Sequence, residues 1–268
     1  MKMSGNLMKM KTRLEDTVDY SLPLSDELLG MNQYLGKTIS MKFDGVINCI
    51  ATGEKIKKSY NQGYSYRAFQ TLAECDICIV KPELCHYSKG TCRDPKWGEE
   101  HCLQPHVVYL ALSSNVKVGI TRKRQVPTRW IDQGATQALA ILEVKDRKTA
   151  GLIEVEIAKE FSDRTDWRKM LKGELDEGDF DLPFLRDQVF ETFGDVIDDF
   201  HADDLDSEIV SINYPILELP KKVTSLSFDK KPVIEGTLMG IKGQYLILDT
   251  GVLNMRKHQG YFIEFSSN

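Results

Sequence analysis

The sequence lacks the features that mark membrane, secretory and fibrous proteins. No apolar run approaches the roughly 18–20 residues that a membrane-spanning helix needs. Residues 1–7 lack the apolar core of a secretory signal, and no long repeat or low-complexity segment occurs. The 268 residues are 41% hydrophobic and 28% charged, which is ordinary for a soluble globular protein and excludes collagen-like and wholly disordered chains. We therefore expect a cytoplasmic protein without membrane contact.

Basic residues are nearly absent from one segment. Residues 173–208 hold fourteen acidic residues and one basic residue, Arg186, for a net charge of −13, whereas the remainder holds 34 basic and 26 acidic residues, for +8. A mildly basic body is typical of proteins that contact nucleic acid, and the acidic segment could mask the contact surface. The alternative is a solvated acidic face with ordinary surface lysines.

All six cysteines fall within residues 49–102, and this stretch shows almost no helical periodicity. In a reducing compartment disulfides are disfavoured, whereas Zn²⁺ takes four thiolate or imidazole ligands and a Cys-x2-Cys pair lets two sulfurs reach one ion. We predict a structural zinc held by four of the cysteines Cys75, Cys78, Cys85, Cys92 and Cys102. Cys75 and Cys78 are the expected pair, and Cys85 or His86 could replace Cys92 or Cys102. Unligated cysteines, a redox pair and a second metal remain alternatives.

The rest of the pattern indicates an α+β protein with five segments. The expected segments are an N-terminal extension (1–35, weakly structured), a β and cysteine-rich zinc segment (36–106), a compact α/β module (107–172), an acidic helical segment (173–209) and a small antiparallel β domain (210–268). Within the module we expect strands at 107–112, 116–120 and 140–144, a helix over 128–138 and a helix over 149–161. A strand near 39–48 could complete the C-terminal sheet.

The module carries a resemblance in Val108-Tyr109-Leu110, in Lys117-Val118-Gly119-Ile120-Thr121 and in Arg129. This pattern resembles the GIY-YIG nuclease superfamily, in which a strand tyrosine is followed ten residues later by a glycine on the next strand. An arginine then begins a helix, and a glutamate lies on a later helix. Tyr109, Gly119, Arg129 and Glu154 match these positions, and the resemblance covers about residues 106–162.

A wider stretch, roughly residues 40–175, resembles an uncharacterised bacterial family, the domain of unknown function 2797. The specific strings are Lys117-Val-Gly-Ile-Thr-Arg122, Pro127-Thr-Arg-Trp-Ile-Asp-Gln-Gly-Ala135 and Gly-Thr-Cys92-Arg-Asp-Pro-Lys-Trp-Gly98. Relatives carry two further Cys-x2-Cys pairs upstream. Here Cys49-Ile-Ala-Thr52 and Ser65-Tyr-Arg-Ala68 keep one cysteine of four, so we expect this first site to be metal-free.

The superfamily resemblance implies metal-dependent cleavage of phosphodiester bonds in DNA or RNA. Such cleavage needs an activated water, a divalent cation and positive charge near the phosphoryl group. By resemblance, Glu154 holds Mg²⁺ or Mn²⁺, Arg129 braces the phosphate, and Tyr109 orients or deprotonates the attacking water. Lys117 replaces the second motif tyrosine, and it could contact a phosphate or act as a general base if desolvation lowered its pKa.

Other interpretations of these residues remain open. The basic run Arg122, Lys123 and Arg124 is expected to contact the nucleic-acid backbone, or it is a solvated loop. Ordinary structural roles would be a strand aromatic for Tyr109, an Arg129–Asp132 ion pair and a solvated Glu154 carboxylate. The alternative functions are a non-catalytic, zinc-containing nucleic-acid-binding protein on the same fold, and a protein–protein adaptor.

Overall fold

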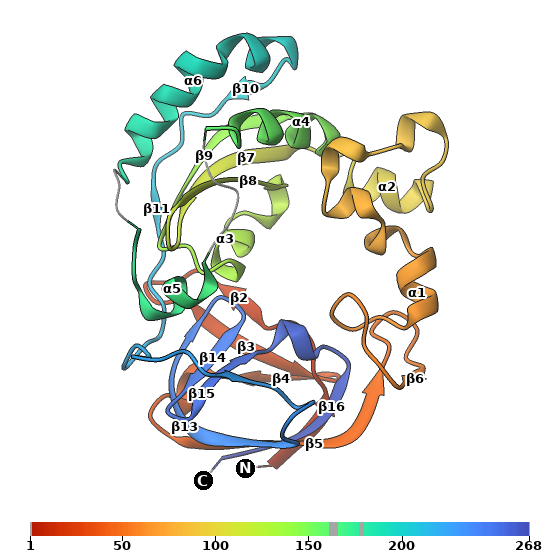
Figure 1. Cartoon of the computed structure of the whole chain (residues 1–268), viewed down its shortest axis with the longest axis vertical. Helices are drawn as coiled ribbons and strands as arrows, with labels where there is room; N and C mark the ends of the chain where they lie inside the picture. Colours follow the sequence, from red (N-terminus) through yellow and green to blue (C-terminus); the bar gives the residue numbers. More distant parts are fainter. Residues whose placement is uncertain (1, 161–165, 177–179, 268) are drawn as a thin grey trace.

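Three sheets organise the protein. The computed structural model describes residues 2–160, 166–176 and 180–267. In these residues the strands form one large sheet, one sheet within the module and one small sheet of three strands. Figure 1 shows the module above the large sheet, with the cysteine-rich segment running along one side of both. Helices and sheets are mixed throughout, so the protein belongs to the α+β class.

The largest sheet joins the two ends of the chain. Its order is β1 (Lys2–Asn6), β16 (Tyr261–Ser267), β5 (Thr38–Asn48), β13 (Val233–Lys242), β14 (Tyr245–Leu248), β15 (Gly251–Asn254) and β12 (Ser225–Leu226), and β6 (Lys55–Ile56) pairs with β5. Met41 of β5 pairs with Phe265 on one side and Ile234 on the other, and all three side chains are buried. The strand near residues 39–48 therefore lies inside the C-terminal sheet. We call this sheet and the small sheet together the β domain.

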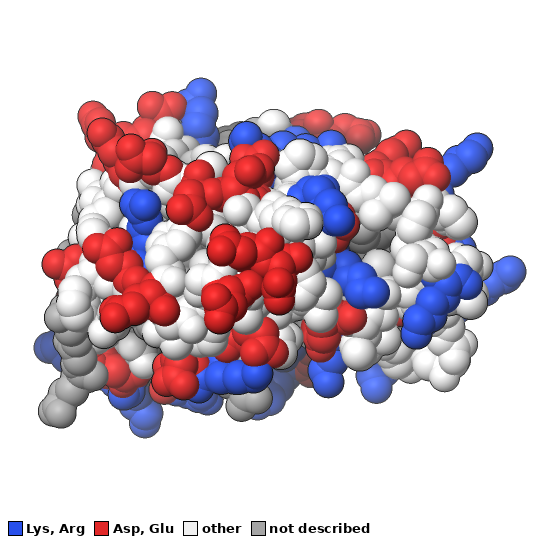
Figure 2. Space-filling view, turned by 90° about the horizontal axis from the view of Figure 1, so that it is seen from above, with Lys and Arg blue, Asp and Glu red and all other residues white. Residues whose placement is uncertain are grey.

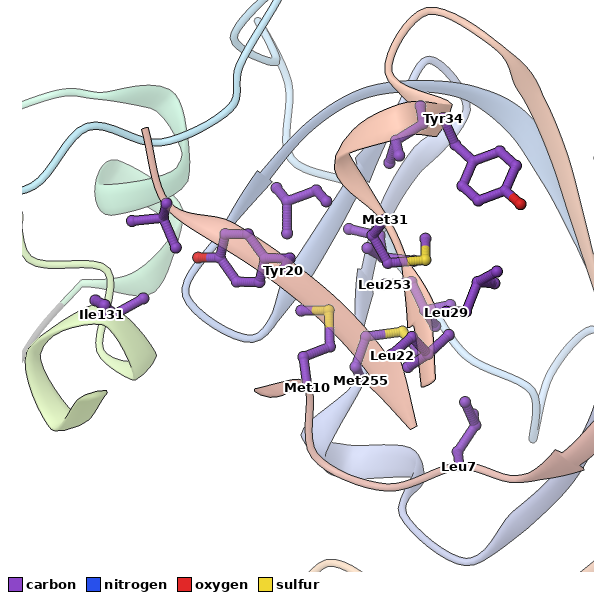
Figure 3. Close-up of a cluster of buried hydrophobic side chains, with 14 of the residues drawn as sticks. Leu7, Met10, Tyr20, Leu22, Leu29, Met31, Tyr34, Ile131, Leu253 and Met255 are labelled. Carbon is purple, nitrogen blue, oxygen red and sulfur yellow. The ribbon is translucent and has the colours of Figure 1, made fainter. Parts of the chain in front are cut away.

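Residues 1–35 are not the weakly structured extension that the sequence suggested. They form β1 and the small sheet of β2 (Lys11–Arg13), β3 (Asp19–Leu24) and β4 (Glu27–Gly30). Figure 3 shows Leu7, Met10 and Tyr20 in one buried cluster with Leu253 and Met255. The partner of β1 lies at the other end of the sequence, and β2 to β4 are short, so no local pattern reveals these strands.

The module has the element order ββαβα. Its elements are β7 (His106–Leu112), β8 (Val116–Arg122), α3 (Thr128–Asp132), β9 (Gln137–Val144) and α4 (Arg147–Ile157), with the sheet order β10-β9-β7-β8. The helix expected to continue to residue 138 ends early because Gly134 adopts a left-handed conformation with φ of 73°. Strand β9 consequently begins before the predicted position.

The two faces of the module sheet pack against different partners. Val108 and Leu110 point to one face, where α4 and α6 (Leu182–Asp199) cover them. Tyr109 and Ala111 alternate with them and join the core that is shared with α3 and the β domain. Figure 3 shows Ile131 of α3 at the end of this core, near Tyr20. Helix α3 therefore connects the module with the β domain.

The acidic segment contains α6, as its apolar spacing predicts. The buried side chains of α6 are Leu182, Val189, Phe193 and Ile197. Figure 2 looks onto this end of the molecule and shows acidic side chains over much of its surface. Because α6 packs against the sheet face opposite Tyr109, its docked position does not cover that residue. After α6, β10 (Asp203–Asp204) and β11 (Val210–Ser211) pair with β9.

The cysteine-rich segment consists of short helical turns. They are α1 (Tyr66–Thr71), η2 (Ala73–Cys75), η3 (Ile77–Ile79), η4 (Pro82–Leu84), η5 (Tyr87–Lys89) and α2 (Pro95–His101). Turn η4 packs directly on α4, where a Cβ on Gly151 would lie 2.5 Å from Pro82 Cβ. The absence of a side chain at Gly151 therefore allows the segment to dock on the helix that carries Glu154. No helix within the described residues, α5 (Trp167–Lys172) included, is long and apolar enough to span a membrane.

Candidate functional site

Tyr109 is the centre of the candidate site, and it is completely buried. Its ring lies across the edge strand β8 at Gly119, the residue directly opposite in the pairing. A Cβ at Gly119 would lie 2.6 Å from the Tyr109 hydroxyl oxygen, closer than any real contact. Gly119 is therefore needed to let the tyrosine reach across β8, which is the edge against which α4 packs.

Three polar side chains influence the Tyr109 hydroxyl through charge or hydrogen bonds. The hydroxyl donates a hydrogen bond to Gln133 Oε1 at 2.8 Å. Burial raises the pKa of Tyr109; the Arg129 charge opposes this effect, the Glu154 charge adds to it, and hydrogen bonds with Arg129 and Gln133 oppose it. Tyr109 lies on β7, Arg129 on α3, Gln133 at the end of α3 and Glu154 on α4, so side chains from three elements influence this hydroxyl.

Lys117 belongs to the same face of the sheet as Gly119. It pairs with Ala111, the residue two positions after Tyr109, and its exposed fraction is 5%. Along a strand, two residues span about 6.6 Å. Lys117 thus lies one pleat away from Gly119, enclosed by the core and not on an open surface.

The basic run divides between two environments. Lys123 forms an ion pair with Glu143 at 2.6 Å, and Arg124 Nη2 donates to the Glu100 carbonyl at 3.1 Å. Arg122 is partly buried, and its pKa is lowered by burial and then by the charges of Arg124 and Arg147. Lys123 is therefore the member of the run with a carboxylate partner, and Arg122 faces other arginines.

Arg147 lies between the Tyr109 group and the cysteines. It begins α4, and its Nη2 donates to the Ile79 carbonyl at 2.6 Å in the cysteine-rich segment. Burial lowers its pKa, the Cys102 thiol opposes this, and the charges of Arg129, Cys78 and Glu154 contribute further. The Arg147 charge therefore interacts with both the Tyr109 group and the cysteines, and α4 packs against both regions.

Four of the cysteines line one small cavity. They are Cys78, Cys85, Cys92 and Cys102. The cavity has about 20 Å³ of space for the centre of a water-sized sphere, which is room for roughly one water or one ion. Burial, followed by the charges of Asp76 and of the other three cysteines, raises the pKa of Cys78 to about 12. The four sulfurs are thus close enough to influence one another.

Asp76, Cys78 and His86 form a candidate metal-binding group at the same cavity. Each offers one ligand atom, and these atoms lie within 4.8 Å of one another. Asp76 is also held by Arg93 Nε at 2.7 Å, and His86 Nδ1 lies 2.8 Å from Thr91 Oγ1. The carboxylate therefore already has a cationic partner, whereas the thiol of Cys78 is close to further thiols.

Cys75 lies apart from the cavity, in contrast to the expected pair of Cys75 and Cys78. Its sulfur accepts a hydrogen bond from Asn61 Nδ2 at 3.6 Å, and Cys49 is among its charged neighbours. Cys49 is buried and its sulfur accepts the Ser65 backbone N–H at 3.2 Å. Cys49 is the one cysteine that remains of the two upstream Cys-x2-Cys pairs, and its sulfur is bound by a backbone donor.

Sequence reasoning missed three residues of these sites. Gln133 was not singled out, yet its Oε1 accepts the hydrogen bond of the Tyr109 hydroxyl. Asp76 and Arg147 carried no motif signal, because their roles depend on the docking of the cysteine-rich segment onto α4. The alternative Arg129–Asp132 ion pair is not formed; Asp132 pairs with Lys9 and accepts from Gln244 Nε2 at 2.9 Å.

The fold and the site define an α+β protein with a ββαβα module, a cysteine-lined cavity and a β domain. Residues 36–263 match the family described as "Protein of unknown function (DUF2797)", and the chain belongs to this family. Searches of curated proteins and of solved structures gave no match.

Proposed function

We propose that the protein is a metal-dependent nuclease that cleaves phosphodiester bonds in DNA or RNA. The observation that supports this most is the convergence of Arg129 and Glu154 on the Tyr109 hydroxyl. A guanidinium, a carboxylate and a phenol in one place are the groups that phosphate binding, cation binding and water positioning need. The ββαβα order of the module agrees with the GIY-YIG resemblance on which the assignment is based.

Tyr109 suits an orienting role better than that of a general base. Burial raises its pKa above the ordinary value of 10.0, so the phenol keeps its proton at neutral pH. With that proton donated to Gln133, the oxygen lone pairs are directed towards Arg129 and the substrate. In this role Tyr109 accepts a hydrogen bond from the attacking water and aligns it with the phosphorus, while Arg129 neutralises charge on the phosphoryl oxygens.

The residues at the site fit a hard divalent cation that is bound together with substrate. Mg²⁺ is commonly bound by one or two carboxylates, several waters and substrate phosphates. Glu154 offers one carboxylate, and within the described ranges it belongs to no cluster of three potential metal ligands. Glu154 would hold Mg²⁺ or Mn²⁺, which supplies positive charge to the phosphate. Affinity for the cation alone should therefore be weak.

The test is cleavage of mixed DNA and RNA substrates with and without Mg²⁺ or Mn²⁺. Glu154→Gln and Arg129→Gln should each lower the cleavage rate by about 100-fold or more. Glu154→Gln removes the carboxylate that would hold the cation, and Arg129→Gln removes the charge that stabilises the phosphoryl group in the transition state. Glu160→Gln, an exposed carboxylate one turn beyond α4, is the matched control and should cleave normally. Cleavage that persists in Glu154→Gln would reject the assignment.

Binding without cleavage is the second candidate, and the complete burial of Tyr109 supports it. A phenol without exposed surface can reach a water only if neighbouring groups move aside. Under this alternative the protein binds nucleic acid with salt-dependent affinity and leaves every substrate intact. The cleavage assay above separates the two candidates, since both predict binding.

For the cysteine cavity we propose one structural zinc ion held by Cys78, Cys85, Cys92 and Cys102. These four cysteines line a space for about one ion, and zinc takes four thiolate or imidazole ligands, with His86 as the alternative fourth ligand. Cys78→Ser should lower the zinc content measured by elemental analysis, whereas Cys75→Ser and Cys49→Ser should keep about one zinc per chain. Equal zinc in the Cys78 and Cys75 variants would contradict this ligand set.

A further inference from the structure

Arg256 brings the β domain to the candidate site. It begins the turn η7 (Arg256–His258) between β15 and β16. The preceding Met255 donates its backbone N–H to the Gln244 carbonyl at 2.8 Å, and Gln244 Nε2 donates to Asp132 of α3 at 2.9 Å. This chain of hydrogen bonds fixes η7 next to the helix that carries Arg129.

Arg256 and Arg129 carry the same charge. Burial lowers the pKa of Arg256, the Arg129 charge lowers it further, and the charge of Asp132 partly opposes both. Asp132 is almost fully buried and is already bound by Lys9 and Gln244. In the described part of the chain, the Arg256 side chain makes no ion pair or hydrogen bond. Two partly buried like charges are unfavourable unless an anion joins them.

The cysteine-rich segment also lies next to Arg256, in addition to the β domain and α3. Tyr64 lies near Arg256, whose charge opposes the rise of the Tyr64 pKa to about 12. The adjoining loop is fixed by Gln259 Nε2, which donates to the Gln62 carbonyl at 2.9 Å. Asn61 and Gln62 have φ angles of 42° and 65°, in the left-handed region that asparagine tolerates and glutamine seldom adopts. Such strain is maintained where the surrounding structure requires it, often at functional sites.

We propose that Arg256 binds the same phosphodiester backbone as Arg129, so that nucleic acid lies between the module and the β domain. The proposal rests on the nucleic-acid role proposed above and adds a residue that the nuclease-like module does not contain. A guanidinium offers a planar pair of N–H donors that matches two phosphate oxygens. The phosphate would also relieve the repulsion between the two arginines.

The experiment compares Arg256→Gln with Lys257→Gln, which removes the same charge from the next residue, an exposed lysine. Short fluorescein-labelled DNA duplexes, DNA single strands and RNA hairpins are titrated by fluorescence anisotropy without divalent metal over a series of salt concentrations. Arg256→Gln should weaken binding by about 10-fold to 100-fold, the range expected for a charge-assisted hydrogen bond. The magnitude of the slope of log affinity against log salt concentration should fall by about 1, the value expected for one lost phosphate contact. Lys257→Gln should change neither quantity by a comparable amount.

A thermal unfolding measurement distinguishes binding from folding defects. Removal of one of two repelling charges should leave the unfolding temperature of Arg256→Gln unchanged or slightly higher. Equal binding by Arg256→Gln, Lys257→Gln and the wild type would overturn the proposal, as would a wild type that binds none of the three probes. If the wild type cleaves substrate but Arg256→Gln binds normally, this proposal fails while the nuclease assignment stands. If the wild type binds but never cleaves and Arg256→Gln binds weakly, the proposal stands and the binding-only function is favoured.

Discussion

The module and the cysteine-rich segment differ in how much apolar surface they bury. Both faces of the module sheet are covered, one by α4 and α6 and the other by α3 and the β domain. The cysteine-rich segment exposes large apolar side chains, including Ile77, Val80 and Leu84, and its turns are mostly single 3₁₀ turns. A segment that buries so little cannot offset the conformational entropy of ordering its chain. With the β domain packed on it, the module should hold its shape without a metal, whereas the segment should need the proposed zinc.

This difference also separates the two sites. The Tyr109 group is held by elements that pack against the β domain, so its geometry should persist without the proposed ion. The cysteine cavity is lined by residues from several turns, so their positions should depend on the proposed ion. The two regions meet at α4, through the Gly151–Pro82 contact and the Arg147–Ile79 hydrogen bond. Loss of the metal should therefore affect the position of α4 before it affects the sheet.

Removal of the proposed zinc should have the largest effect, and it should act on the cysteine-rich segment and not on the module. Structural zinc supplies on the order of 10 kcal/mol of apparent free energy to small zinc peptides, so a chelator should unfold much of residues 49–102. Hydrogen exchange should show loss of protection in this range and unchanged protection in β7 and β9. Re-addition of zinc should restore protection. Uniform loss of protection across the module would show that the two regions are not independent.

Acid should destabilise the seam between the two regions. His106 at the start of β7 is fully buried, and burial chiefly lowers its pKa from 6.5 to about 4. The unfolded state therefore binds a proton that the folded state rejects. The contribution of neutral His106 to the free energy of unfolding is complete above about pH 6.5. It is lost as the pH falls towards about 4, and the total loss is about 3 kcal/mol.

Denaturant unfolding of His106→Phe across this pH range tests the assignment. The variant should lack this part of the pH dependence, and it should lose some stability at neutral pH because the hydrogen bond of Nδ1 to the Gln104 carbonyl is removed. The exposed His201→Asn is the control, with an unchanged pH profile. A wild-type slope in His106→Phe would assign the titration to another group.

Gly119→Ala should have the smallest effect on stability. It tests whether the module holds the Tyr109 hydroxyl in a fixed position. The new Cβ would overlap the Tyr109 hydroxyl at 2.6 Å, and overpacking of this kind costs about 1–3 kcal/mol. If the nuclease assignment holds, the displaced tyrosine should also lower the cleavage rate. The control is Gly194→Ala on α6, where a Cβ meets nothing within 4 Å and stability should be equal or slightly higher. Equal unfolding free energies for the two variants would contradict the role of Gly119.

Much of the module could be predicted from the sequence. The hairpin, the third strand and α4 follow from apolar alternation and helical spacing, because the partners of β7 lie close in the sequence. Tyr109, Gly119, Arg129 and Glu154 were singled out by the GIY-YIG resemblance and not by periodicity. The amphipathic spacing of the acidic segment likewise predicted α6.

Contacts between residues distant in sequence were decided only by the tertiary structure. The strands of residues 2–30 depend on partners such as β16, and no local pattern encodes that pairing. The spacing of Cys75 and Cys78 suggested one pair of ligands, but the turn between them directs Cys78 into the cavity and leaves Cys75 beside Asn61. Arg256 carries no motif, and its importance arises because η7 docks against α3. Local periodicity determines elements, whereas docking between them determines which charges meet.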